Sequence, residues 1–172
     1  MRWGVRSGAA LMVLLAAVGC GVQKSGPQKQ EKPAVADLEI ITHGEKVDLA
    51  AHLAAGKYTV IDFYAAWCPP CRLVGPAIER LAAKESQRLA VRKVDIVDWT
   101  MPVVEQYAIE ALPHLMLYGP DGQRVADGDA VYAELVKIFG ESAHEVSEAG
   151  DAIGVEAPPG TPTTDAQGQQ NL

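Results

Sequence analysis

The sequence is poor in cysteine, aromatic residues and positive charge. Aromatic residues make up only 6% of its 172 residues, and there are only three cysteines. Lys and Arg number 15 against 22 Asp and Glu, which gives a net charge of -7. Because phosphate binding needs clustered Lys and Arg, this balance argues against a nucleic acid partner. The hydrophobic share of 48% still allows an ordinary globular core.

Near the N-terminus the chain carries one short apolar run, Ala9–Val18, preceded by Arg2 and Arg6. A run of about ten residues is too short to span a bilayer comfortably and is typical of a secretory signal. It ends at Ala17–Cys20, which resembles a bacterial lipobox, although Leu is usual at the position of Ala17. We therefore expect residues 1–19 to be a lipoprotein-type signal peptide and Cys20 to carry the lipid that anchors the chain. An ordinary cleaved signal and a buried core helix are the alternatives.

Composition divides the rest of the chain into three parts. Residues 20–36 are rich in Gln, Lys, Pro, Gly and Ser, which predicts a flexible tether. Residues 37–143 carry alternating strand-like and helical patterns, which predicts one α/β domain. Residues 144–172 lead into a segment rich in Pro, Gly, Thr and Gln, and we expect a disordered tail.

Within the domain, apolar and β-branched runs predict strands and amphipathic spacing predicts helices. The expected strands are residues 38–42, 58–64, 89–96, 114–118 and 123–126, the last two joined by a hairpin turn at Asp121-Gly122. The expected helices are residues 47–55, 71–84, 101–107 and 130–139.

The close pair Cys68 and Cys71 falls just after a predicted strand and at the start of a predicted helix. The unpaired N–H groups and the dipole of a helix N-terminus favour an anion such as a thiolate, which is the nucleophile in disulfide exchange. A second thiol one helical turn away can attack the mixed disulfide and release the reduced partner. The spacing therefore favours redox chemistry.

Two plainer interpretations of the pair are a half-built zinc site and a structural disulfide. Zinc needs two more ligands, and the four histidines show no ligand spacing (His43, His52, His114, His144). A disulfide across so short a loop constrains little of the unfolded chain, so it would stabilise little. Copper held by the thiols is a third alternative. We expect no cofactor and no metal.

The residues around the pair resemble the thioredoxin family. Val60–Cys68 is similar to the strand and turn that lead into that family's active site, and Pro76 stands where the family has a helix-kinking proline. Tyr107–Pro113 resembles the approach to its cis-proline, and 114–118 the strand behind it. The resemblance covers about 105 residues. It implies a thioredoxin-like three-layer α/β fold, with a central mixed β-sheet flanked by helices.

The resemblance also implies roles for the residues nearest the sulfurs. Cys68 would attack and Cys71 would resolve. Asp62 would be a buried carboxylate with a raised pKa that takes a proton from Cys71, and Lys93 would be its neighbour. The plainer alternatives are a carboxylate at the strand edge for Asp62 and a solvated lysine for Lys93.

The resemblance further implies a docking face for substrate. The turn at Leu112 and Pro113, joined by a cis bond, would pack against the cysteines, and the backbone before the proline would pair with the substrate chain. Trp67 would shield the disulfide and form part of the docking face. The alternatives are a loop proline and simple packing. Other positions depart from the family. Pro69-Pro70 replaces Gly-Pro, Ala108 and Ala111 stand where glycine is common, and His114 stands where threonine is common.

Taken together, the sequence predicts a thiol–disulfide oxidoreductase at the cell envelope, facing the periplasm. The expected partners are cysteine-containing envelope or secreted proteins, a membrane electron donor and the membrane itself through the lipid. Reduction of envelope disulfides is the first hypothesis. Disulfide oxidation or isomerisation, and a non-catalytic binding module, are the alternatives.

Overall fold

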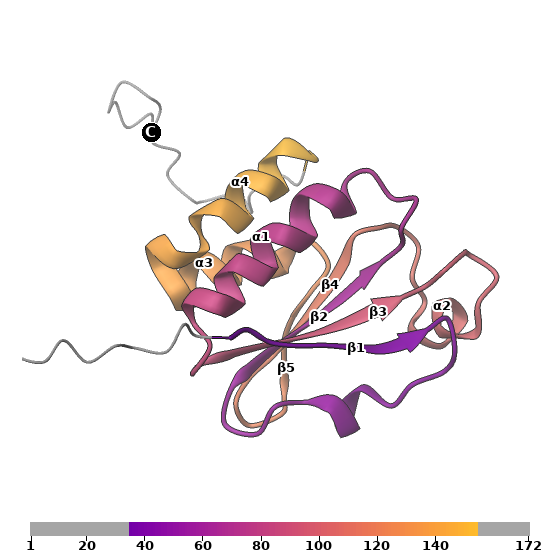
Figure 1. The fold of residues 1–172 in the computed structure, drawn as a ribbon, viewed down its shortest axis with the longest axis horizontal. Helices are drawn as coiled ribbons and strands as arrows, with labels where there is room; N and C mark the ends of the chain where they lie inside the picture. The colour runs from indigo at the N-terminus through magenta and orange to yellow at the C-terminus, as the bar shows by residue number, and fades with distance from the viewer. Residues whose placement is uncertain (1–34, 155–172) are drawn as a thin grey trace, which may run out of the picture. The chain divides into compact units, whose positions relative to one another are not determined.

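The computed structural model describes residues 35–154 and contains a five-stranded sheet covered by helices on both faces (Figure 1). The strands lie in the order β1-β3-β2-β4-β5. β1, β3 and β2 run parallel, while β4 is antiparallel to β2 and β5 to β4. In chain order the elements are β1 (Asp37–His43), η1 (Leu49–His52), β2 (Tyr58–Tyr64), α1 (Cys71–Lys84), β3 (Leu89–Asp95), α2 (Pro102–Tyr107), β4 (His114–Tyr118), β5 (Arg124–Asp127), α3 (Ala130–Phe139), η2 (Gly140–Ala143) and α4 (His144–Ala152).

The alternation of side chains along β2 explains why the sheet has a core on each side. Val60 faces a cluster built with residues of α1, α3 and α4, whereas Ile61 and Phe63 face a second cluster with η1 and α2. Successive strand residues point to opposite faces, so a strand with no solvated face is apolar at nearly every position. The predicted three-layer fold with a central mixed sheet is confirmed.

Two elements differ from the sequence-based prediction. The helix expected at 47–55 is only a four-residue 3₁₀ turn, η1, in which the side chain of Asp48 accepts the N–H of Ala50. The disordered tail expected from residue 144 is wrong for residues 144–152, which form α4. Val146 is fully buried there, and Glu145 pairs with Arg80 and Lys84 of α1. Few apolar residues mark this short helix, so only its contacts with α1 and α3 reveal it.

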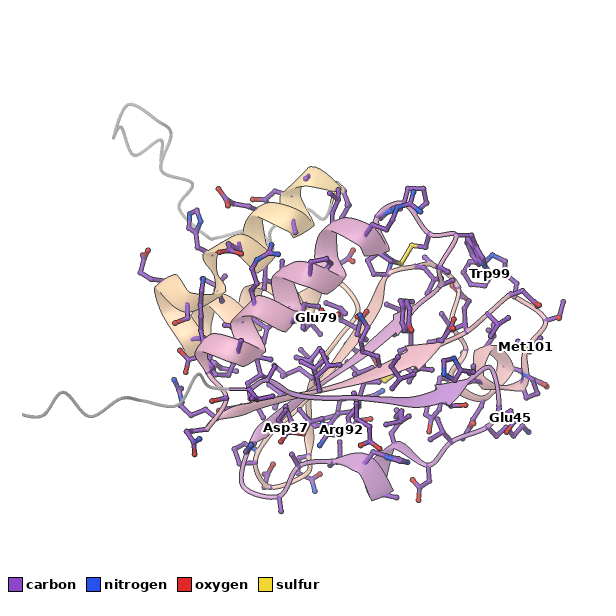
Figure 2. All side chains as sticks on the ribbon, in the orientation of Figure 1. Asp37, Glu45, Glu79, Arg92, Trp99 and Met101 are labelled. Carbon is purple, nitrogen blue, oxygen red and sulfur yellow. A yellow bond between two sulfur atoms is a disulfide. The ribbon has the colours of Figure 1, made fainter. Side chains whose placement is uncertain are left out.

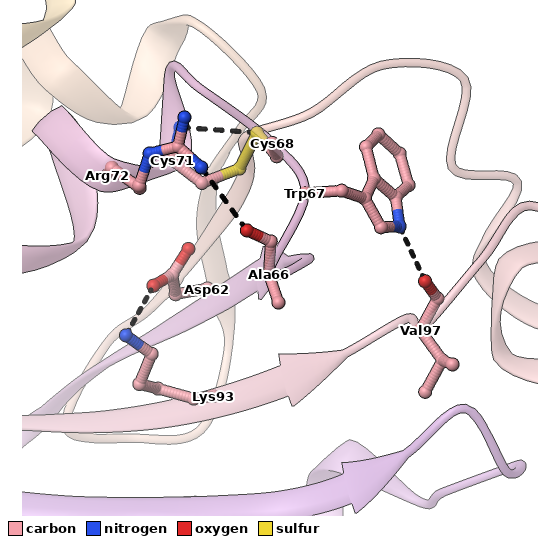
Figure 3. The surroundings of a disulfide bond; sticks show 8 residues. All are labelled: Asp62, Ala66, Trp67, Cys68, Cys71, Arg72, Lys93 and Val97. Carbon is pink, nitrogen blue, oxygen red and sulfur yellow. Dashed lines mark hydrogen bonds and ion pairs between the residues drawn. A yellow bond between two sulfur atoms is a disulfide. The ribbon is translucent and has the colours of Figure 1, made fainter.

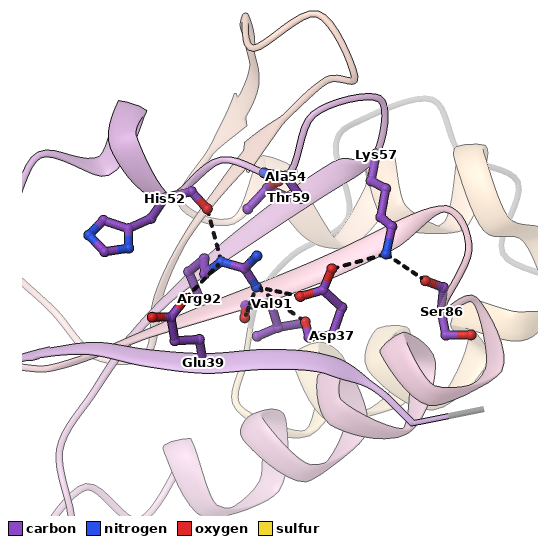
Figure 4. Close-up of polar contacts among 9 residues, drawn as sticks. All are labelled: Asp37, Glu39, His52, Ala54, Lys57, Thr59, Ser86, Val91 and Arg92. Carbon is purple, nitrogen blue, oxygen red and sulfur yellow. Dashed lines mark hydrogen bonds and ion pairs between the residues drawn. The ribbon is translucent and has the colours of Figure 1, made fainter. Parts of the chain in front are cut away.

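A buried arginine ties the start of the domain to the sheet (Figure 4). Arg92 of β3 is only 8% exposed. Its guanidinium donates to the carboxylate of Asp37 at 2.9 Å and to the carbonyl of His52 at 2.9 Å. Lys57 completes the group, since its ammonium lies 3.0 Å from the second oxygen of Asp37. Burial raises the pKa of Asp37, but the hydrogen bonds from Lys57 and Arg92 outweigh it and hold that pKa below its usual range.

The predicted signal peptide, the lipid site at Cys20, most of the tether and the end of the tail lie outside the described residues. Among residues 35–154, the structure contains no helix with the length and hydrophobicity needed to cross a bilayer.

Candidate active site

The site is built where β2 ends and α1 begins. β2 is buried on both faces, so its end at Tyr64 is fixed by the core. The chain then turns, with the N–H of Cys68 donating to the carbonyl of Ala65 at 3.1 Å. Pro70 caps α1 in helical conformation, a position where proline's fixed φ suits the helix and its missing N–H costs nothing.

Cys68 and Cys71 are joined by a disulfide at the N-terminal end of α1 (Figures 2 and 3). Their Cα atoms lie 5.4 Å apart. The backbone N–H of Cys71 donates to Sγ of Cys68 at 3.2 Å. This donor will stabilise a thiolate on Cys68 when the bond opens, because a hydrogen bond to an ionised acceptor is stronger than one to a neutral acceptor.

Both half-cystines are buried as whole residues, Cys68 at 2% exposure and Cys71 at 6%. Exposure therefore does not distinguish the attacking thiol from the resolving one. The hydrogen bond is what differs between them, because the sulfur of Cys68 receives the N–H at the helix start. The roles of the two cysteines stay predictions.

Asp62 lies in the middle of the buried strand β2 and points to the face that α1 covers. The residue is 1% exposed, and its Oδ1 has no hydrogen-bond partner. Its Oδ2 would lie 3.8 Å from a Cβ added at Gly75 of α1, so the helix runs directly over the carboxylate. The alternative of a solvated carboxylate at the strand edge is therefore wrong.

Lys93 comes from the neighbouring strand β3, paired in register with Asp62. Its Nζ lies 3.5 Å from Oδ2 of Asp62 (Figure 3) and donates to Glu79 at 2.7 Å. The same ammonium lies 4.6 Å from the centre of the Tyr64 ring. Lys93 is therefore a partly buried cation with three partners and not an ordinary solvated lysine.

Burial sets the protonation of this group. Loss of water raises the pKa of Asp62 from 3.8 to about 6, although the charge of Lys93 opposes the shift. Burial lowers the pKa of Lys93, but the hydrogen bond to Glu79 and the charge of Asp62 more than reverse this, so that its pKa lies above the ordinary value. A carboxyl group with a pKa of about 6 is suited to accept and release protons near neutral pH.

The predicted proline turn lies at the same end of the sheet. The Leu112–Pro113 bond is cis, as predicted. His114, the next residue, pairs with Phe63 near the end of β2, which brings the turn beside the chain that leads to Cys68. Leu112 packs against the apolar cluster that contains both cysteines.

Trp67, next to Cys68, is half exposed, and a hydrogen bond to the loop after β3 holds its side chain. Its indole N–H donates to the carbonyl of Val97 at 2.6 Å (Figure 3). Its ring lies 5.8 Å from that of Trp99, measured between ring centres. Trp67 is therefore fixed on the surface next to Cys68 and is not simply packed in the core.

Several known proteins are similar to this chain. A model of the thioredoxin family matches residues 26–140. A thioredoxin-like protein of Fusarium culmorum is 38% identical over 86 residues, which cover 49% of this chain and 70% of that one. Thioredoxin 1 of Synechococcus elongatus is 42% identical over 66 residues, 38% of this chain and 60% of that one. Among solved structures, the reduced thioredoxin pre-protein of Schistosoma mansoni is 27% identical, with a TM-score of 0.47, over 60% of this chain and 99% of that one.

The chain belongs to the thioredoxin family. Together with the Cys68–Cys71 disulfide, this membership confirms the predicted fold and the predicted disulfide oxidoreductase activity.

Two departures from the thioredoxin family pattern have visible consequences here. Pro69, where glycine is usual, has no N–H to offer, and the hydrogen bond to Sγ of Cys68 comes from the N–H of Cys71. Ala108, where glycine is common, ends α2 with φ at 52°. A left-handed backbone is strained for any residue with a Cβ, which explains why glycine suits this position.

Sequence reasoning missed three contributors to the site. Glu79 lies on α1 and binds Lys93; its position two turns after Cys71 was a usable signal. Trp99 lies in a loop where nothing in the pattern indicated a contact with Trp67. Asp127 of β5 accepts from His114 at 2.8 Å, a pairing that depends on the hairpin register. Within residues 35–154, no cluster of three or more His, Cys, Asp or Glu side chains is arranged to hold a metal ion.

Proposed function

We propose that this protein reduces disulfides of envelope or secreted proteins through the Cys68/Cys71 dithiol. The Cys68 thiolate attacks one sulfur of a substrate disulfide, and the other substrate sulfur leaves as a thiolate. Cys71 then loses its proton and attacks Sγ of Cys68, which re-forms the Cys68–Cys71 disulfide and releases the second substrate thiol. Two electrons pass to the substrate, and a separate electron donor must restore the dithiol.

Asp62 is the proposed base for the second step. Its raised pKa of about 6 gives it a useful affinity for a proton while leaving it mostly ionised at neutral pH. Cys71 is the first residue of the helix that covers Asp62. Lys93 keeps the pKa of Asp62 from rising further.

The observation that carries the direction of electron flow is the scarcity of donors to Cys68. In the part of the chain that the structure describes, its Sγ receives one hydrogen bond, from the N–H of Cys71, because Pro69 and Pro70 offer none. A strong oxidant needs a reduced form that is strongly stabilised. A thiolate with a single backbone donor is stabilised less than one with several, which favours a reductant. The short connection between β3 and β4, which holds only the six-residue α2, also supports reduction, because envelope oxidases of this family usually carry a large helical insertion.

The decisive test is the reduction potential of the Cys68/Cys71 couple in the full-length chain, measured by equilibration with dithiothreitol. A reductant is expected near the value of about -270 mV typical of thioredoxin, whereas an oxidase would lie nearer -120 mV, both on the same scale. The wild-type chain should also reduce insulin when dithiothreitol is supplied. Cys68→Ser is the matched control, and full activity of that variant would defeat the proposal.

The location is part of the same proposal. The sequence at Ala17–Cys20 supports cleavage before Cys20 and acylation of its thiol, which would place the domain on the periplasmic side of a membrane. Metabolic labelling with an alkyne fatty acid should mark the wild-type chain and not Cys20→Ser. Equal labelling of both chains would refute the lipid anchor without touching the redox chemistry.

A further inference from the structure

The loop after β3 presents an unusual group of exposed apolar side chains beside the disulfide. Trp67 is 48% exposed, Trp99 45% and Val97 41%. Trp67 precedes Cys68, whereas Val97 and Trp99 come from the far side, after the end of β3 (Figures 2 and 3). We call these three residues the aromatic shelf. Three large apolar side chains left in water together need a reason, because single exposed ones are ordinary but clusters mark interaction sites.

The backbone of the shelf is held in a costly shape. Val97 has φ at 59°, which is a genuine outlier for a β-branched residue. This shape directs the Val97 carbonyl at the indole N–H of Trp67, 2.6 Å away. Strain that persists at the edge of a reactive group points to a function for the conformation it supports.

Two neighbouring aspartates hold the backbone of this loop by hydrogen bonds. Oδ1 of Asp95 accepts the N–H of Val97 at 2.9 Å. Oδ1 of Asp98 accepts the N–H of Thr100 at 2.7 Å and its hydroxyl at 2.6 Å. The shelf is therefore preformed, so binding of a partner loses less conformational entropy than it would at a mobile loop.

The chemistry of Cys68 determines what occupies the shelf. Any protein in a mixed disulfide with Cys68 has its own cysteine bonded to that sulfur, so its neighbouring residues must lie over the adjoining surface. Trp67 is the next residue to Cys68, and Trp99 extends that surface outwards. Aromatic residues are the type enriched at such contacts, since they contribute large rigid apolar area.

We propose that the aromatic shelf selects substrates, and that Trp99 makes the protein prefer a disulfide-bonded cysteine whose neighbouring residue is aromatic or a large aliphatic. This inference rests on the proposed function and names its substrate class. The occupant is an extended polypeptide segment with an apolar side chain next to its reactive cysteine. Trp99 binds that side chain, while Val97 positions Trp67 through its carbonyl.

Two disulfide-bonded peptides test the inference, identical except for Trp or Ser beside one cysteine. The pre-reduced full-length chain is mixed with each peptide, and the second-order rate constant of reduction is measured. The wild type should react about three- to ten-fold faster with the Trp peptide, the range expected from one aromatic contact. Trp99→Ala should bring the ratio close to one, and Trp99→Phe should keep most of it.

The matched control is Val125→Ala on the edge strand β5, which removes an equally exposed apolar side chain outside the shelf. This variant should keep the wild-type ratio. Equal rates for both peptides in the wild type, or an unchanged ratio in Trp99→Ala, would overturn the role of the shelf while leaving the reductase intact. A wild type that reacts with neither peptide would instead overturn the proposed function and this inference with it.

Discussion

Replacing Asp62 by Asn should stabilise the oxidised protein at neutral pH. The folded chain holds the pKa of this carboxyl at about 6, against 3.8 in the unfolded chain. Between about pH 4 and about pH 6 the carboxyl of Asp62 holds its proton in the folded chain and has lost it in the unfolded chain. The free energy of unfolding therefore falls as the pH rises through this range, and it stays lower above about pH 6. A difference of about two units corresponds to about 3 kcal/mol at pH 7. Asn has the same shape and no charge, so the variant should recover most of that amount.

The assay is urea unfolding of the oxidised wild type and Asp62→Asn at pH 4, 5, 6 and 7. The gain in unfolding free energy should be near zero at pH 4, where the wild-type carboxyl is protonated, and should grow to about 3 kcal/mol at pH 7. Asp121→Asn, an exposed aspartate in the β4–β5 turn, is the control and should show no such growth. A difference that does not change with pH, or a less stable variant at pH 7, would refute the reasoning.

Three smaller changes test the surroundings. Lys93→Met removes the cation that lowers the pKa of Asp62, so that pKa should rise above about 6, as followed by carboxyl NMR; an unchanged pKa would show that the pair is not coupled. Ala108→Gly should stabilise the protein by about 0.5–1 kcal/mol in urea unfolding, because the strain that glycine relieves at the left-handed φ exceeds the conformational entropy that it adds to the unfolded chain. A loss of stability would contradict this. Gly150→Ala would place a Cβ 2.7 Å from the ring of Tyr132 and should cost about 1–3 kcal/mol. A neutral effect would mean that α4 does not pack on α3 as described.

The sequence predicted best the parts of the fold whose pattern is local. The bounds of β2 and α1 follow from an apolar β-branched run and from helical spacing, and the structure confirms both. The cis bond before Pro113 and the Cys68–Cys71 pair follow from a family pattern carried by a few residues. These signals lie within one element or one turn, so a single sequence displays them.

What the sequence could not predict depends on contacts between distant segments. The burial of Asp62 is decided by α1 crossing over β2, and strand alternation alone leaves it open. The pairing of Trp67 with the loop at Val97 joins residues thirty positions apart through a strained backbone. α4 has too little apolar pattern to be found before its partner helices are placed.

Capture of the covalent intermediate tests the central claim most directly. The Cys71→Ser chain, mixed with a peptide disulfide, should stop at a mixed disulfide, and peptide mapping by mass spectrometry should find the bond on Cys68. The Cys68→Ser chain should capture far less of the same peptide. If neither variant forms a mixed disulfide, or if Cys71 alone forms it, then Cys68 at the start of α1 is not the attacking thiol and the account is wrong.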